Sequence, residues 1–184
     1  MKVLLRAPGM FLAIVLMLVA SSSAQEQSEA DRILRVVLTH LRHAVRDGGT
    51  TTAGKVGFDP RPVQVRLTPG LELRPLPPLG PPAWGEERSP GQFAAITRDI
   101  ATASRFDTAL VCPPRGRRCE LRGAALVIAA SEPIIDGGRA RVFVWERHRS
   151  AAAREGVVEA LLEISLVRAG DGWKVAGTRY ILVT

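Results

Sequence analysis

The sequence predicts an α+β fold in which two helices pack on a curved antiparallel sheet. Two segments have apolar residues at helical spacing, and the chain from residue 124 onwards is dominated by long β-rich segments. Turn sequences separate those β-rich segments. Helices followed by a run of strands are typical of the α+β class, because each element must bury one apolar face.

The first 24 residues have the pattern of a secretory signal peptide. Lys2 and Arg6 precede an uncharged apolar run, residues 10–20, and small residues follow up to Ala24. This run is about half as long as the roughly 20 apolar residues of a membrane span. We therefore expect residues 1–24 to be removed and residues 25–184 to form one exported domain. The alternative is an uncleaved amino-terminal anchor.

The charge composition indicates a bacterial protein without a nucleic-acid footprint. The chain has a formal net charge of +7, its basic residues are mostly arginine, and asparagine is absent. Such a bias is typical of a GC-rich bacterial genome, which places the exported domain in the periplasm or outside the cell. Nucleic-acid binding would need basic residues clustered with aromatics, whereas these arginines are scattered and aromatics make up 5% of the chain. We expect no nucleic-acid partner and no stable membrane insertion after cleavage.

A first helix is predicted over residues 28–46. Ser28 is a candidate cap, and Gly48 and Gly49 end the pattern. The apolar residues lie on one face at helical spacing: Ile33, Leu34, Val37, Leu38, Leu41, Ala44 and Val45.

Two short strands and a proline-rich segment follow. Residues 55–58 and 63–67 have β-like composition, but Asp59-Pro60-Arg61-Pro62 interrupts them, so we expect short edge strands around a turn. Residues 69–90 are rich in proline and glycine and should run over the surface.

A second helix is predicted from Pro90 to about Ala103. Ser89 is the expected cap and Gln92 completes a capping box with it. A strand over residues 107–111 should follow it.

Cys112 and Cys119 are the two cysteines of the chain, and we expect them to form a disulfide around a small loop. A redox pair would more typically have two intervening residues, and a zinc site would need two further ligands. The loop tip carries Arg115, Arg117 and Arg118, which either hold an anionic group or form a solvated tip.

The carboxy-terminal part predicts an antiparallel meander of four strands. Asp136-Gly137-Gly138 and Ala169-Gly170-Asp171-Gly172 are turn sequences between them. The four expected strands are residues 124–135, 139–149, 157–168 and 172–183.

This order of elements, closing on Gly-Asp-Gly-Trp-Lys-Val at residues 170–175, resembles the NTF2-like superfamily. The resemblance implies a sheet curved around helices into a cone. It also implies an internal pocket, which some members use for isomerase or dehydratase chemistry and many others for binding. No functional residue of the family is carried over to this chain.

His40 is the best candidate for a pocket acid or base, because it lies at the margin of the apolar helix face. Asp99 or Asp107 would orient it. The alternative is a boundary histidine that bonds to a backbone carbonyl. The sequence contains no recognised metal-ligand spacing, nucleophile elbow or phosphate loop, so we expect no metal and no cofactor.

Arg179 is the candidate binding residue of the last strand. It shares strand parity with Trp173 and Val175, and on that face it would be buried and require Glu146, a carboxylate on a facing strand or an anionic ligand. A bulge at Gly177 would instead make it a surface arginine.

These features predict an exported, non-enzymatic domain that binds a small molecule or a cell-envelope partner. The alternative is a small pocket enzyme with acid and base chemistry around His40. An enclosed cavity of several hundred Å³ with converging polar groups would favour the enzyme.

Overall fold

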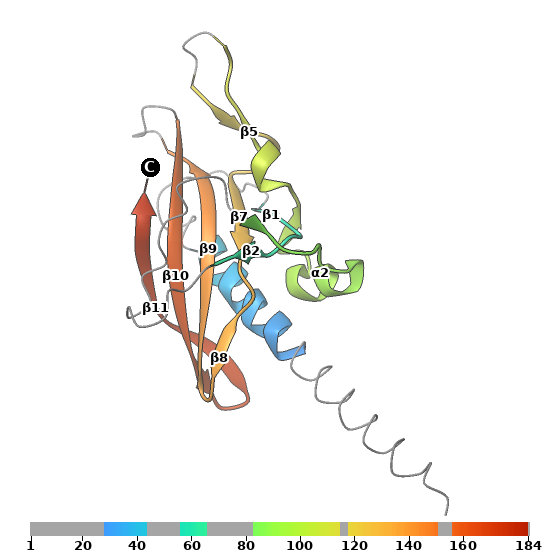
Figure 1. Ribbon diagram of the computed structural model, residues 1–184, viewed down its shortest axis with the longest axis vertical. Coiled ribbons are helices and arrows are strands. Elements are labelled where there is room, and N and C mark those ends of the chain that lie inside the picture. Colours follow the sequence, from blue (N-terminus) through green and yellow to red (C-terminus); the bar gives the residue numbers. More distant parts are fainter. Residues whose placement is uncertain (1–27, 44–55, 66–82, 115–117, 151–155, 184) are drawn as a thin grey trace, which may run out of the picture.

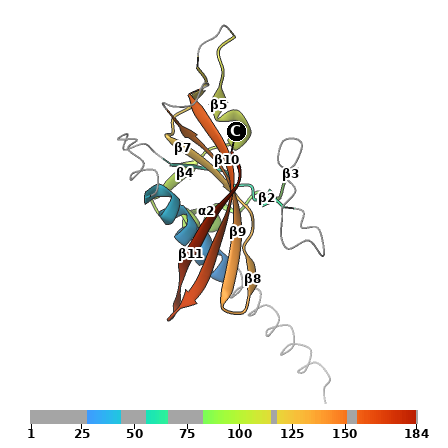
Figure 2. The same ribbon diagram turned by 90° about the vertical axis from the view of Figure 1, so that its left-hand side faces the viewer.

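The computed structural model describes residues 28–43, 56–65, 83–114, 118–150 and 156–183. Two helices in this part of the chain lie across one face of a seven-stranded sheet (Figures 1 and 2), which confirms the predicted α+β class. The predicted leader, the end of the first helix and most of the proline-rich segment lie outside the described residues.

The strand order of the sheet is β11-β10-β9-β7-β1-β4, and β8 pairs with β9 beside this path. Pairing is antiparallel from β7 to β11 and parallel where β1 lies between β4 and β7. The strands are β1 (Val56–Phe58), β4 (Ala101–Ala103), β7 (Leu126–Ala130), β8 (Ile134–Asp136), β9 (Arg139–Arg149), β10 (Val157–Ala169) and β11 (Gly172–Val183).

The predicted meander is present, with its first strand divided into β7 and β8. Both segments pair with β9, at successive stretches of that strand. At the break, the Ser131 hydroxyl accepts a hydrogen bond from the Phe143 backbone N–H at 3.0 Å, in place of a ladder bond. Pro133 cannot donate to a ladder, so the chain bends here without leaving the sheet.

The last two strands contain two irregularities in register. Ser165 lies opposite Gly177 whereas Leu166 lies opposite Val175, so Ala176 is an extra residue in β11. A second shift lies between Leu161 and Leu162. The first shift is the bulge that was predicted as an alternative at Gly177, and it changes the face on which Arg179 lies.

Both predicted helices are present. Residues 28–43 are helical, and their apolar face is buried against the sheet. Helix α2 (Pro90–Thr97) begins with the predicted capping box between Ser89 and Gln92.

The predicted end of α2 near residue 103 is wrong. Arg98 (φ 30°) and Asp99 (φ 66°) have left-handed backbone, which ends the helix at Thr97. The chain then returns to the sheet as β4, parallel to β1.

The expectation that residues 55–58 form an edge strand is also wrong, because β1 lies inside the sheet. All three of its residues are buried, and it pairs with β4 on one side and β7 on the other. Gly57 permits this close packing, since a Cβ there would lie 2.8 Å from the Ser104 Cβ. The following segment forms β2 (Val63–Gln64), which pairs with β3 (Ala83–Trp84) as a separate ribbon.

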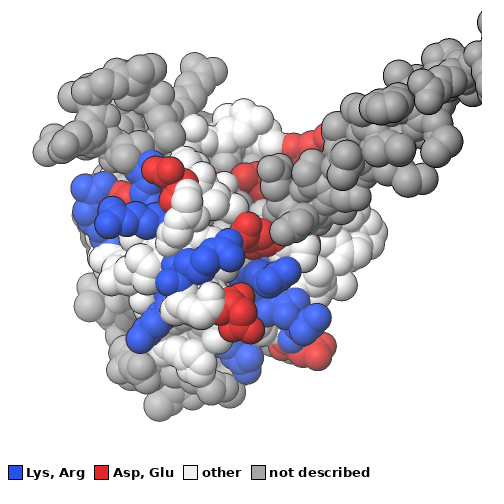
Figure 3. Space-filling view, turned by 90° about the horizontal axis from the view of Figure 1, so that it is seen from below, with Lys and Arg blue, Asp and Glu red and all other residues white. Residues whose placement is uncertain are grey.

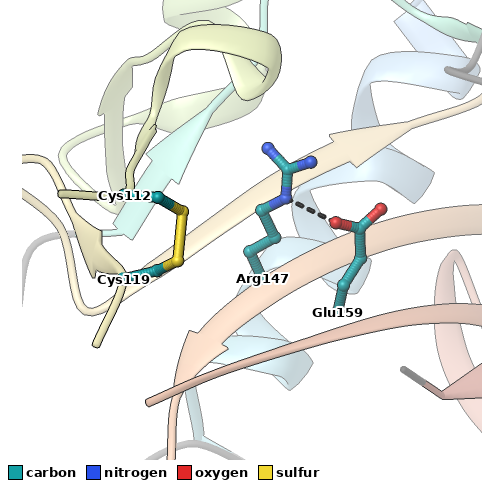
Figure 4. The surroundings of a disulfide bond; sticks show 4 residues. All are labelled: Cys112, Cys119, Arg147 and Glu159. Atoms are coloured by element: carbon teal, nitrogen blue, oxygen red, sulfur yellow. Dashed lines mark hydrogen bonds and ion pairs between the residues drawn. A yellow bond between two sulfur atoms is a disulfide. The ribbon is translucent and has the colours of Figure 1, made fainter. Parts of the chain in front are cut away.

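The region expected as a strand over residues 107–111 is a short 3-10 helix, η1 (Phe106–Thr108), followed by β5 (Leu110–Val111). Strand β5 pairs with β6 (Glu120–Leu121) to form an arm that projects from the end of the sheet (Figure 1). The predicted disulfide between Cys112 and Cys119 closes this arm. Figure 4 places it beside Arg147, which contacts Glu159.

Reduction of this disulfide is expected to lower the free energy of unfolding by about 2.5 kcal/mol, the chain-entropy value for so short a ring. Urea unfolding with and without reductant measures the difference. Reductant should not change the urea unfolding of the variant Cys112→Ser/Cys119→Ser, which has no disulfide to reduce. An unchanged wild-type transition on reduction would show that the arm contributes no constraint to the unfolded chain.

The sheet separates two hydrophobic clusters. On the helix face, Ile33, Val37 and Leu38 pack with α2 and with alternate residues of the strands. On the opposite face, Phe106 of η1 packs with Trp145 and Leu161 of the sheet, and Val63 and Trp84 of the β2–β3 ribbon join this cluster. Among the described residues, neither helix combines the length and apolar character that crossing a membrane requires.

Candidate anion-binding groove

Two open grooves lie on the sheet face opposite the helices. The first, which we call the basic groove, has a volume of about 720 Å³ and crosses β8 to β11. Its charged and polar lining consists of Asp136, Arg139, Arg141, Glu163, Ser165 and Arg179.

Strand alternation and register bring these side chains together. Arg139 and Arg141 are two positions apart on β9 and therefore point to the same face. Arg141 lies opposite Ser165 on β10, and Glu163 lies opposite Arg179 on β11. The groove thus depends on three neighbouring strands.

Arg179 is an exposed arginine of this groove, not a buried one on the helix face. Its guanidinium forms an ion pair with Glu163, whose side chain is 9% exposed, whereas that of Arg179 is 59% exposed. The partner is therefore a carboxylate on the facing strand. Glu146, the other partner considered, has the strand parity of the helix-face residues, and its Oε1 lies 3.6 Å from His148 Nδ1.

Arg141 has a polar atom without a hydrogen-bond partner among the described residues. Its Nη1 is buried, and no acceptor in the described part of the chain lies within hydrogen-bond distance. A buried donor without a partner costs free energy, and more so on a charged group. A guanidinium at the floor of a groove is a suitable donor for a carboxylate or phosphate.

The second groove, which we call the apolar groove, has a volume of about 470 Å³. It lies between the β2 segment and the strands β8 and β9, and Ile134 lines both grooves. Most of its lining is apolar or glycine, namely Pro62, Val63, Val65, Gly85, Ile134 and Phe143, and its polar lining consists of Gln64, Ser131 and Glu132.

A buried carboxylate fixes the wall of the apolar groove. Asp59 is fully buried at the end of β1. It accepts hydrogen bonds from the backbone and guanidinium of Arg61 at 2.8 to 3.0 Å, and from the Phe106 N–H at 2.8 Å. The hydrogen bonds that the Arg61 side chain donates to Asp59 are the main reason that the pKa of Arg61 is raised. The Arg61 guanidinium also lies 4.2 Å from the centre of the Trp84 ring. From the sequence alone, residues 59–62 were predicted only as a turn.

Arg88 provides a second link between this wall and the sheet. It is buried, and it donates to the Pro60 and Ala130 carbonyls and to Glu132 at 2.7 Å. Burial lowers the pKa of Arg88, and the charge of Glu132 opposes that shift. Arg88 was not predicted as a site residue, because no local sequence pattern distinguishes it from the exposed arginines.

His40 lies on the helix side of the sheet, and its Nε2 lies 3.1 Å from the Thr178 Oγ1. Asp99 is exposed in the turn after α2, and no hydrogen bond within the described residues joins it to His40. Asp107, the other proposed orienting residue, pairs with Arg61 at 3.1 Å. A catalytic role for His40 or Asp99 stays a prediction.

At the tip of the arm, Arg118 is exposed near Gly156, whereas Arg115 and Arg117 lie outside the described residues. The basic groove therefore does not depend on the tip. No group of three or more potential metal ligands occurs in the described residues.

Comparison of the chain with family models, curated proteins and solved structures finds no match. The resemblance to the NTF2-like superfamily therefore stays a prediction from the order and patterning of the elements.

Proposed function

We propose that this chain is an exported, non-enzymatic domain that binds a small anionic molecule in the basic groove. The observation that carries the proposal is the buried Nη1 of Arg141, which has no acceptor in the described residues. Nη1 has almost no surface exposed to solvent, so a carboxylate or phosphate oxygen of a ligand would provide that acceptor once the Arg141 side chain turns into the groove.

The neighbouring charges favour an anion over a cation. Arg139, Arg141 and Arg179 line the groove with two carboxylates, Asp136 and Glu163, and Glu163 is already paired with Arg179. Figure 3 shows Lys and Arg side chains with Asp and Glu among them on the end of the molecule seen from below. This local mixture suits a small anion better than a long polyanion, which would need a continuous basic surface.

Two features support export. Residues 1–24 have the order of charged, apolar and small residues that leaders share, and the two cysteines form a disulfide. Mass spectrometry of material from the periplasm or medium should give a chain beginning near Gln25. An intact amino terminus in that material would contradict removal of the leader.

The substitution Arg141→Met is expected to weaken anion binding at least tenfold, because a bidentate charged donor is lost from the floor of the groove. Isothermal titration calorimetry with inorganic phosphate and with acetate measures this change. The same substitution should raise the free energy of unfolding of the unliganded protein by about 1 kcal/mol, since it removes a buried donor without a partner.

Arg122→Ala is the matched control, because Arg122 is an exposed arginine outside the lining of either groove. It should bind both anions as wild type does. Equal anion affinity of Arg141→Met and wild type would refute the proposed function.

A further inference from the structure

We infer that the ligand is a monomeric, single-chain amphiphile whose carboxylate binds at Arg141 and whose hydrocarbon chain lies in the apolar groove. This inference rests on the proposed function and adds the chemical class of the ligand. It follows from the position of the two grooves relative to each other.

The two grooves adjoin each other. Ile134 lines both, and it is only partly buried. Phe143, in the apolar groove, is two positions from Arg141 on β9, so the two side chains leave the same face about 7 Å apart. An extended molecule with its charge on Arg141 therefore reaches Phe143 within a few carbon atoms.

The apolar groove has the chemistry to hold a hydrocarbon chain. Pro62, Val65 and Ile134 are partly exposed in its lining, while Val63 and Phe143 are buried. Arg61 and Arg88 line neither groove, and both have acidic partners nearby, in Asp59 and Glu132. Arg88 also has a buried donor without an acceptor, its Nε, but its charge is paired with Glu132, whereas no ion pair of Arg141 occurs within the described residues.

The charge arrangement selects the head group and its orientation. A neutral amphiphile would leave the buried donor of Arg141 without a partner. A cationic one would face three arginines and two carboxylates, one of which, Glu163, is already paired. A carboxylate satisfies that donor while the chain removes apolar surface of the second groove from water.

A chain-length series tests this inference. We expect the affinity for acetate, butanoate, hexanoate, octanoate and decanoate, measured calorimetrically below micelle formation, to rise about threefold per methylene until the groove is filled. Decanol, with the same chain and no charge, should bind at least tenfold more weakly than decanoate.

Two neighbouring isoleucines supply matched variants. Ile134→Ser should weaken decanoate binding about tenfold, because it removes apolar lining where the two grooves adjoin. Ile135→Ser, at an exposed residue of the same strand outside both linings, should change neither decanoate nor acetate binding. Val65→Ser, on the opposite wall, lines the apolar groove and not the basic one, so it should weaken decanoate binding similarly and leave acetate binding unchanged.

The outcomes separate this inference from the proposed function. Affinity that is independent of chain length, with Arg141→Met still impaired, would overturn the amphiphile and retain the anion site. Arg141→Met binding every probe as wild type does would overturn both. Co-sedimentation with phosphatidylglycerol vesicles, without binding of monomeric decanoate, would replace the monomeric ligand by a membrane surface.

Discussion

Replacing Asp59 by alanine is expected to lower the free energy of unfolding by about 3 kcal/mol. The substitution removes a fully buried carboxylate and leaves the Arg61 guanidinium and the Phe106 N–H without their acceptor. Removal of one partner of a buried ion pair costs about 3 to 5 kcal/mol, and the low end applies because the Arg61 side chain is 16% exposed. Urea unfolding followed by circular dichroism measures the loss.

Asp107→Ala is the matched control for this prediction. Asp107 also pairs with Arg61, at 3.1 Å, but its side chain is 49% exposed. An exposed pair contributes about 1 kcal/mol or less. If the two substitutions cost the same, burial of Asp59 is not what holds the β2 segment, and with it the wall of the apolar groove, against the sheet.

Phe58→Ala is expected to cost about 3 to 5 kcal/mol, the range for truncating a buried aromatic residue. Phe58 is fully buried in β1, packs against Phe93 of α2 at 5.9 Å between ring centres, and lies 5.5 Å from the Arg88 guanidinium. The cavity left by the missing ring of Phe58 would therefore lie between α2 and the sheet, close to the buried charge of Arg88.

Val111→Ala is the comparison for a hydrophobic residue outside the core, because Val111 is 40% exposed on β5. It should change the free energy of unfolding by no more than about 0.5 kcal/mol. Thermal unfolding of both variants tests the pair. A small effect of Phe58→Ala would mean that α2 and the sheet do not unfold as one unit.

The start of α2 was predictable to the residue, whereas its end was not. The capping box joins Ser89 and Gln92, which are three positions apart, so the chain carries the whole signal locally. The end depends on Arg98 and Asp99 taking left-handed backbone, which neither residue type requires. The apolar residue Ile100 continued the helical pattern because it packs on the same cluster from the turn.

The position of β1 shows a similar limit. Residues 56–58 are a short apolar segment beside a proline-rich turn, and that pattern is typical of an edge. Its place between β4 and β7 comes from two parallel pairings with segments 45 and 70 residues further along the chain, as the pairs of Val56 with Ala101 and Leu126 show. A strand without such pairings in view cannot be assigned to the interior of a sheet.

The face on which Arg179 lies depends on the register of the last strand. Strand parity placed it with Trp173 and Val175, and the bulge at Ala176 moved it to the other face, where Glu163 meets it. A bulge at Gly177 was the alternative that the sequence predicted. No sequence pattern pointed to Arg141, because its importance depends on a buried atom that has no hydrogen-bond acceptor in the described residues.

Caps, turns and the disulfide follow from residues a few positions apart, so the linear chain was sufficient to specify them, together with the α+β class. Strand order, the interior place of β1 and the two adjoining grooves depend on which distant segments pair and on one extra residue in β11. Long-range pairing and register are set by the simultaneous packing of both sheet faces, and no short stretch of sequence contains that information.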